Sequence, residues 1–161
     1  MTWMTRPSEI ARLLNPAFCG EVLRRTISKY ETTGGQGLPY SLAFLVLPIV
    51  LHRETRTKLP RRIRNLHPWL QSHQEVKIDF ARRARSLVLY TKEAICFLLI
   101  AGIVRITDDA RIILNPDASV KPSSSSDEEI QDVYAKAETL GRVFCHAGTP
   151  ATLFSMWGVM P

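Results

Sequence analysis

Apolar residues recur at helical spacing through the first third of the chain, which predicts helices there. Ser8 precedes a short apolar-periodic stretch, and Asn15 followed by Pro16 is a typical start for a second helix. This second helix is expected to end at the glycines of "ETTGGQG". Its buried stripe is predicted to comprise Phe18, Cys19, Val22, Leu23, Ile27 and Tyr30. Further along, "NLHPWLQSH" predicts a short helix anchored by Trp69 and Leu70.

The run Leu38–Leu51 is strongly apolar but contains Tyr40, Ser41 and two prolines in its fourteen residues. A helix needs about twenty apolar residues to span a bilayer, so we do not expect this run to cross a membrane. We expect instead a helix that is buried on all sides. Pro48 has no backbone N–H to donate to the carbonyl of Phe44, so it should kink this helix. A buried strand is the alternative, because the run is rich in β-branched residues.

The next region has the order of elements found in a winged helix. A helix over Val76–Leu89 is followed by a turn and by a second helix, capped by Thr91 and closed by Gly102. Two β-rich pieces follow, Ile103–Ile106 and Arg111–Leu114, joined by the turn-like "TDDA". After its first two residues the second helix, "KEAICFLLIA", has no side chain that could read base edges. We therefore interpret the unit as a docking module.

The last part of the chain predicts a connector and two further helices. "NPDASVKPSSSSDEE" is typical of a flexible connector, and Ser126 with Glu129 matches a capping box. Gly148 should end the long helix that follows, and Thr149 with Pro150 should start the last one. The predicted fold class is mainly α (α+β): a helical N-terminal half on a winged-helix-like unit with a two-stranded wing, plus C-terminal helices. We expect one compact domain, 1–161, with sub-regions 7–73 (helical), 74–116 (winged-helix-like), 117–127 (connector) and 128–161 (C-terminal helices).

Charge is unevenly distributed along the 161 residues, whose formal net charge is +6. Between His52 and Lys92 there are eleven Lys and Arg residues against three Asp and Glu. This excess suggests an anionic partner, and contact with nucleic acid would run through phosphates, without base specificity. A solvated basic face is the alternative. The candidate phosphate-contacting residues are Arg53, Arg56, Lys58, Arg61, Arg62, Arg64, Arg82, Arg83 and Arg85.

The C-terminal sequence "ATLFSMWGVMP" is too apolar to hang free in water. Two explanations remain open: it folds back on the core, or it anchors another subunit, as exposed tryptophans often do. The candidate interface residues are Leu153, Phe154, Met156 and Trp157.

No residue pattern indicates catalysis, a metal or a cofactor. Cys145 and His146 are adjacent, and neighbours on a helix do not face each other. The histidines and the three cysteines lack metal-ligand spacing, and "TGGQG" lacks the Lys-Ser/Thr of a phosphate cradle. The N-terminal residues do not form a secretory signal. We therefore expect a non-enzymatic protein of the reducing cytoplasm.

Four segments together resemble a known family: "LLNPAFC", "GLPYSLAFLVLPIVLH" with "TRTKLP" after it, "YTKEAICFLL", and "LGRVFCHAGTPATLFSMWGVMP". They are similar to the middle component of bacterial three-component ABC systems, which are antiphage or anti-plasmid defence loci related in organisation to Lamassu. The resemblance implies an adaptor without catalytic residues, in a hetero-oligomer with an ATPase of the chromosome-maintenance (SMC) type and an effector that often bears a nuclease. A winged-helix transcriptional regulator is the alternative function.

Overall fold

The computed structural model describes residues 7–160, and most of them lie in helices. The α-helices are α1 (Ser8–Leu13), α2 (Pro16–Gly34), α3 (Ala43–Val50), α4 (Arg53–Lys58), α5 (Leu66–Ser72), α6 (Phe80–Ile100), α7 (Glu128–His146) and α8 (Pro150–Met156). Short 3-10 helices cover Tyr40–Leu42 and Gln74–Lys77, and the strands are β1 (Leu38–Pro39), β2 (Val104–Ile106) and β3 (Arg111–Leu114). The mainly α fold class is confirmed. The expectation about a secretory signal depends partly on residues 1–6, which lie outside the described part.

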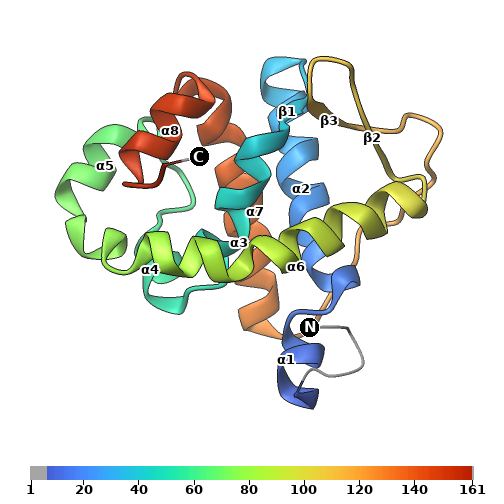
Figure 1. The fold of residues 1–161 in the computed structure, drawn as a ribbon, viewed down its shortest axis with the longest axis horizontal. Coiled ribbons are helices and arrows are strands. Elements are labelled where there is room, and N and C mark those ends of the chain that lie inside the picture. Colours follow the sequence, from blue (N-terminus) through green and yellow to red (C-terminus); the bar gives the residue numbers. More distant parts are fainter. Residues whose placement is uncertain (1–6, 161) are drawn as a thin grey trace.

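Helices α2 and α7 form the central pair, packed along most of their lengths (Figure 1). The hydroxyl of Thr26 donates across the pair to the carbonyl of Ala137 at 3.1 Å. Gly141 makes the close approach possible, because a Cβ there would clash with the carbonyl oxygen of Thr26. Two helices that touch through backbone and small groups cannot slide without opening the core.

The ends of these two helices follow local signals, with one correction. The side chain of Asn15 accepts the N–H of Phe18 at 2.8 Å, and α2 ends at Gly35 with a φ of 72°, both as predicted. Helix α7, however, is capped by Asp127, whose carboxylate accepts the N–H groups of Glu129 and Ile130. The predicted capping box headed by Ser126 is therefore wrong by one residue, because a carboxylate is the stronger acceptor at the positive helix start.

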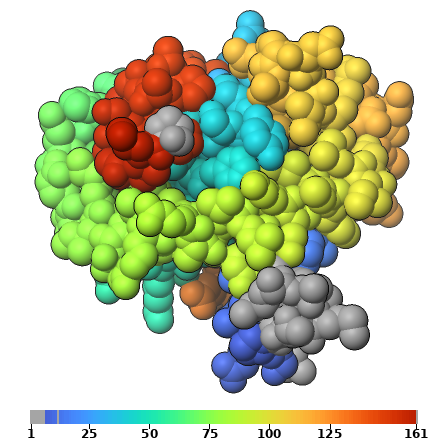
Figure 2. All heavy atoms as spheres, viewed as in Figure 1, coloured from blue at the N-terminus to red at the C-terminus, as the bar shows by residue number. Residues whose placement is uncertain are grey.

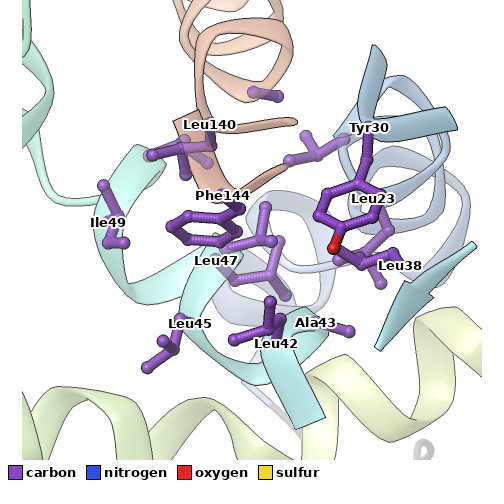
Figure 3. Packing of buried hydrophobic residues seen from close by; sticks show 14 of the residues in the cluster. Leu23, Tyr30, Leu38, Leu42, Ala43, Leu45, Leu47, Ile49, Leu140 and Phe144 are labelled. Carbon is purple, nitrogen blue, oxygen red and sulfur yellow. The ribbon is translucent and has the colours of Figure 1, made fainter. Parts of the chain in front are cut away.

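Helix α3 lies at the centre of the core, between α2, α6 and α7. Figure 3 shows its leucines surrounded by side chains from α2 and α7, including Leu23, Leu140 and Phe144. The prediction that the run Leu38–Leu51 is buried is confirmed. The prediction that it forms a single helix is wrong. The run begins instead as strand β1, continues through the 3-10 turn, and becomes α-helical at Ala43, with Pro48 inside the helix. Pro39 cannot donate to a strand partner, which suits this short edge position.

The predicted helix-turn-helix is wrong, because Phe80–Ile100 is one continuous helix of 21 residues. Its hydrophobic inner face crosses α2 and α3 (Figure 1). Thr91, read from the sequence as a cap, is buried in mid-helix, and its hydroxyl donates to the carbonyl of Leu87 at 3.0 Å. Threonine can satisfy its hydroxyl this way inside a helix, so a lone threonine is a weak start signal. The predicted winged-helix layout of 74–116 therefore lacks its two separate helices.

The predicted hairpin is present, and it belongs to a three-stranded antiparallel sheet. The strand order is β1-β3-β2, with Leu38 opposite Ile112 and Val104 opposite Leu114. The backbone N–H of Thr107 donates to the carbonyl of Arg111 across the "TDDA" turn. Strand β1 thus ties the hairpin to the segment that leads into α3, which the sequence did not predict.

Candidate interaction surfaces

The nine candidate phosphate-contacting residues fall into two groups, and Arg56 shows the first. Its side chain is buried, with the residue 3% exposed, and it donates to the carbonyl of Val50 at 2.9 Å. It also pairs with the carboxylates of Glu129 at 2.6 Å and Asp132 at 3.0 Å. A guanidinium so engaged joins α4 to α7, and only 4% of the Arg56 side chain is exposed to a partner.

Lys136, which the sequence reading missed, completes this junction from α7. It is 6% exposed, and its ammonium donates to the backbone carbonyls of Arg56 and Leu59 at the end of α4. Burial lowers the pKa of Lys136 despite the nearby carboxylate of Asp132. The sequence around Lys136 gives no signal of its burial, because the carbonyls it bonds lie some eighty residues earlier.

Three more of the nine cations are engaged within the chain. Arg83 donates to the carbonyls of Pro48, Val76 and Ile78, and so holds the start of α6 against the end of α3. Lys58 pairs with Glu75 at 2.8 Å, and Arg82 with Asp79 at 2.9 Å. The last two pairs are at the surface, where an ion pair contributes little and opens easily.

The other five candidates, Arg53, Arg61, Arg62, Arg64 and Arg85, are exposed. Arg61, Arg62 and Arg64 lie in the loop between α4 and α5, whose backbone is fixed to α7. The carbonyl of Arg61 accepts from Thr139 at 3.1 Å and from Arg142 at 2.7 Å. The loop therefore presents three cationic side chains to solvent from an anchored backbone.

The C-terminal candidates are mostly inside the molecule. Leu153, Phe154 and Trp157 are buried, and Met156 is partly exposed. The ring of Trp157 stacks on Phe80 with centroids 4.5 Å apart. Of the two explanations offered by the sequence, the structure shows the fold-back. Met156 is the member of the set with surface left for a partner.

Cys145 and His146 occupy successive positions at the end of α7, one partly buried and the other exposed. Burial raises the pKa of the Cys19 thiol to about 12, so that thiol is not a nucleophile near neutral pH. Within residues 7–160, no three His, Cys, Asp or Glu side chains lie close enough together to hold a metal ion. None of the helices in this range has the length and hydropathy of a transmembrane segment.

An exposed apolar strip on α6 was not predicted from the sequence. Leu89 is 44% exposed, Phe97 39% and Ile100 88%, and Cys96 is also exposed. Figure 2 shows α6, in yellow-green, running uncovered across the front of the molecule. The sequence does contain a signal for this strip, because α6 continues three residues past Phe97 with apolar residues on both of its faces. We call Leu89, Cys96, Phe97 and Ile100 the outer strip of α6.

A model of the family described as "ABC-three component (ABC-3C) system Middle Component 3" matches residues 3–161. The chain belongs to this family. No curated protein and no solved structure matches it. The resemblance carried by the four sequence segments is thereby confirmed, and membership of this middle-component family implies that other ABC-3C components are its partners.

Proposed function

We propose that this ABC-3C middle component is a non-enzymatic adaptor that links an SMC-type ABC ATPase to an effector, often a nuclease. It would act as a single compact domain in the cytoplasm, within an antiphage or anti-plasmid defence complex. The observation that carries the proposal is the family match over residues 3–161. A component that has no recognised chemistry of its own but belongs to a multi-protein system contributes most simply through contacts.

The environments of the buried polar side chains support this proposal. Polar groups with buried or perturbed environments, Arg56, Lys136 and Arg83, all bond to backbone carbonyls or to carboxylates of the same chain. They hold helices together and do not converge on a cavity, unlike the groups of a catalytic site. Meanwhile the outer strip of α6 leaves apolar side chains in solvent, which is typical of a surface that a partner covers.

Co-expression tests the adaptor role. The chain should co-purify through size exclusion with the ATPase and with the effector of its own system, and should bridge the two when both are present. Each pairwise complex is measured separately with tagged partners. Association with neither component would contradict the proposal.

We further propose that the anchored loop Arg61–Arg64 contacts DNA through phosphates. Three exposed arginines on a fixed backbone supply charge without base-reading groups. The triple variant Arg61→Glu, Arg62→Glu, Arg64→Glu should weaken binding to any duplex in fluorescence anisotropy. The plot of log K against log salt should also become less steep, with the magnitude of its negative slope reduced by roughly 3. The matched control reverses Lys29, Arg105 and Lys121, which gives the same net charge.

Equal losses in the two triple variants would show that net charge and not this loop attracts DNA. A sequence-specific regulator, the alternative function, predicts preference for one duplex over competitor. This alternative is disfavoured because the helix that should read bases is the second half of α6, whose exposed side beyond Lys92 and Glu93 has no base-reading side chain.

A further inference from the structure

We propose that the outer strip of α6 docks an amphipathic helix, flanked by Asp or Glu, from the ATPase or the effector of the system. This inference rests on the adaptor function proposed above, and it names the surface and the chemistry of the partner. It follows from the spacing, the exposure and the charge of residues on one helix.

The spacing on the exposed side of α6 is that of a coiled-coil seam. Its side chains recur at Arg82, Ser86, Leu89, Glu93, Cys96 and Ile100, alternating intervals of four and three residues. This is the repeat of a and d positions that lets a second helix lie along the first. The part from Leu89 to Ile100 is apolar except at Glu93, and spans about 17 Å at 1.5 Å per residue.

The opposite side of the same helix is already used. Phe80, Thr91, Ala94, Ile95 and Leu98 are buried against the core. The residues of the outer strip are therefore separate from the residues with which α6 packs against the core. Ile100, at 88% exposed, is the most solvated member, so it has the most apolar surface to remove from water when a partner covers it.

Two cations border the seam. Arg85 and Lys92 are exposed and seven residues apart, so they occupy equivalent positions on one flank. In coiled coils these flanking positions pair with charges on the facing helix and set the choice of partner. Carboxylates on the partner helix would complement both. This charge pattern selects an acidic amphipathic helix over a neutral one.

The same charges argue against a second copy of this chain. Between Leu89 and Ile100 the acidic residue is Glu93, which is partly buried and already engaged in an interaction within its own chain. A facing α6 would therefore offer Arg85 and Lys92 no free carboxylate from its own seam. A parallel pair would also set like charges opposite each other.

Cys96 gives a direct readout, because it lies within the strip and is exposed while Cys19 is buried. In a Cys145→Ser background, alkylation of Cys96 by N-ethylmaleimide is followed by mass spectrometry, with and without the co-expressed ATPase or effector. We expect complex formation to slow the reaction at least tenfold. An unchanged rate in an intact complex would overturn the inference while leaving the adaptor function standing.

Variants supply a second, independent measurement. Ile100→Glu should weaken the same complex at least tenfold, whereas Leu13→Glu, at an apolar residue of α1 that is 71% exposed, should not. The pair Arg85→Glu, Lys92→Glu should weaken the complex as well, whereas the control pair Arg53→Glu, Arg105→Glu, at exposed residues outside α6, should change its affinity less than twofold. Circular dichroism confirms that each variant is folded.

Three results would count against the proposal. Wild-type affinity both in Ile100→Glu and in the pair Arg85→Glu, Lys92→Glu would overturn this inference and leave the adaptor function standing. Self-association of the chain that Ile100→Glu abolishes would assign the strip to a second copy. Absence of any complex with either component would overturn both the inference and the adaptor function.

Discussion

His52 caps helix α4 with an imidazole nitrogen, which makes the start of this helix sensitive to pH. Its Nδ1 lies 2.8 Å from the hydroxyl of Thr55 and accepts the backbone N–H of the same residue. Burial, together with the charges of Arg83 and Arg56, lowers the pKa of His52 from its ordinary value of 6.5. The unfolded chain then binds this proton more readily than the folded one. Stability is therefore lost as pH falls below about 6.5.

Asparagine can cap the same helix without titrating. Between about pH 7.5 and about pH 5.5, the wild type should lose more unfolding free energy than His52→Asn, as measured by urea denaturation. Other titrating groups are shared by the two proteins and cancel in the comparison. Equal losses would mean that folding does not lower the pKa of His52.

Arg56, one of the candidate phosphate contacts, is bonded to groups of its own chain and is expected to stabilise the fold. Arg56→Ala should cost about 2–3 kcal/mol of unfolding free energy, because the carbonyl of Val50 loses its charged donor. The cost stays below that of a fully buried pair, since Asp132 and Glu129 keep access to water. Arg53→Ala, at an exposed position of the same helix, should change stability by less than about 0.5 kcal/mol. Denaturant titration of the two variants compares them, and a similar effect of both would contradict the junction described for α4.

At the scale of elements, the continuity of α6 can be tested at one residue. If a second helix began after Thr91, Lys92 would be its first residue, where proline is favoured. In a continuous helix, Lys92→Pro removes a hydrogen bond in the interior and clashes with the preceding turn, at a cost of about 3 kcal/mol. Lys92→Ala serves as the control. The melting temperatures of both variants are measured by thermal unfolding, and that of Lys92→Pro should be clearly lower. An unaltered melting temperature for Lys92→Pro would favour two helices in place of one continuous α6.

Elements were predictable where a short-range signal decides them. Asn15 with Pro16, the glycines after Thr33 and the turn Thr107–Ala110 each fix a local geometry, and the structure has them. Strand β1 was not predictable, because its pairing with Ile112 depends on residues over seventy positions away. The break assigned at Thr91 failed because a threonine hydroxyl can bond within a helix as well as cap one.

The sequence predicted which residues are cationic or apolar, but it did not predict which of them are exposed to solvent. Arg53 and Arg56 belong to one short helix and look alike in sequence, yet one is solvated and the other is enclosed by α7. What separates them is the position of Glu129 and Asp132, which no local pattern gives. The apolar C-terminus likewise allowed two outcomes, and packing on Phe80 and Trp69 distinguished them.

At the scale of the whole molecule, Trp157 joins the C-terminal segment to the middle of the chain. Its ring is buried against Phe80 and Trp69, so Trp157→Ala should cost about 3–5 kcal/mol in urea denaturation. Trp157→Phe should cost less, because the indole N–H is buried without a hydrogen-bond partner and its loss breaks no bond. Met160→Ala, at a side chain that is 92% exposed, should be close to neutral. A neutral Trp157→Ala would show that the C-terminal segment does not stabilise the fold.

The pairing of α2 with α7 has a consequence for how the chain is made. Helix α2 leaves the ribosome long before α7, so the part of its apolar surface that α7 covers stays exposed until α7, more than ninety residues later, has been synthesised. At ~5–20 residues per second this delay is on the order of 10 s. During translation the chain therefore carries the exposed surface of an unfinished core. Synthesis in the presence of chaperones, or beside the components it binds, would shorten the time for which that surface can aggregate.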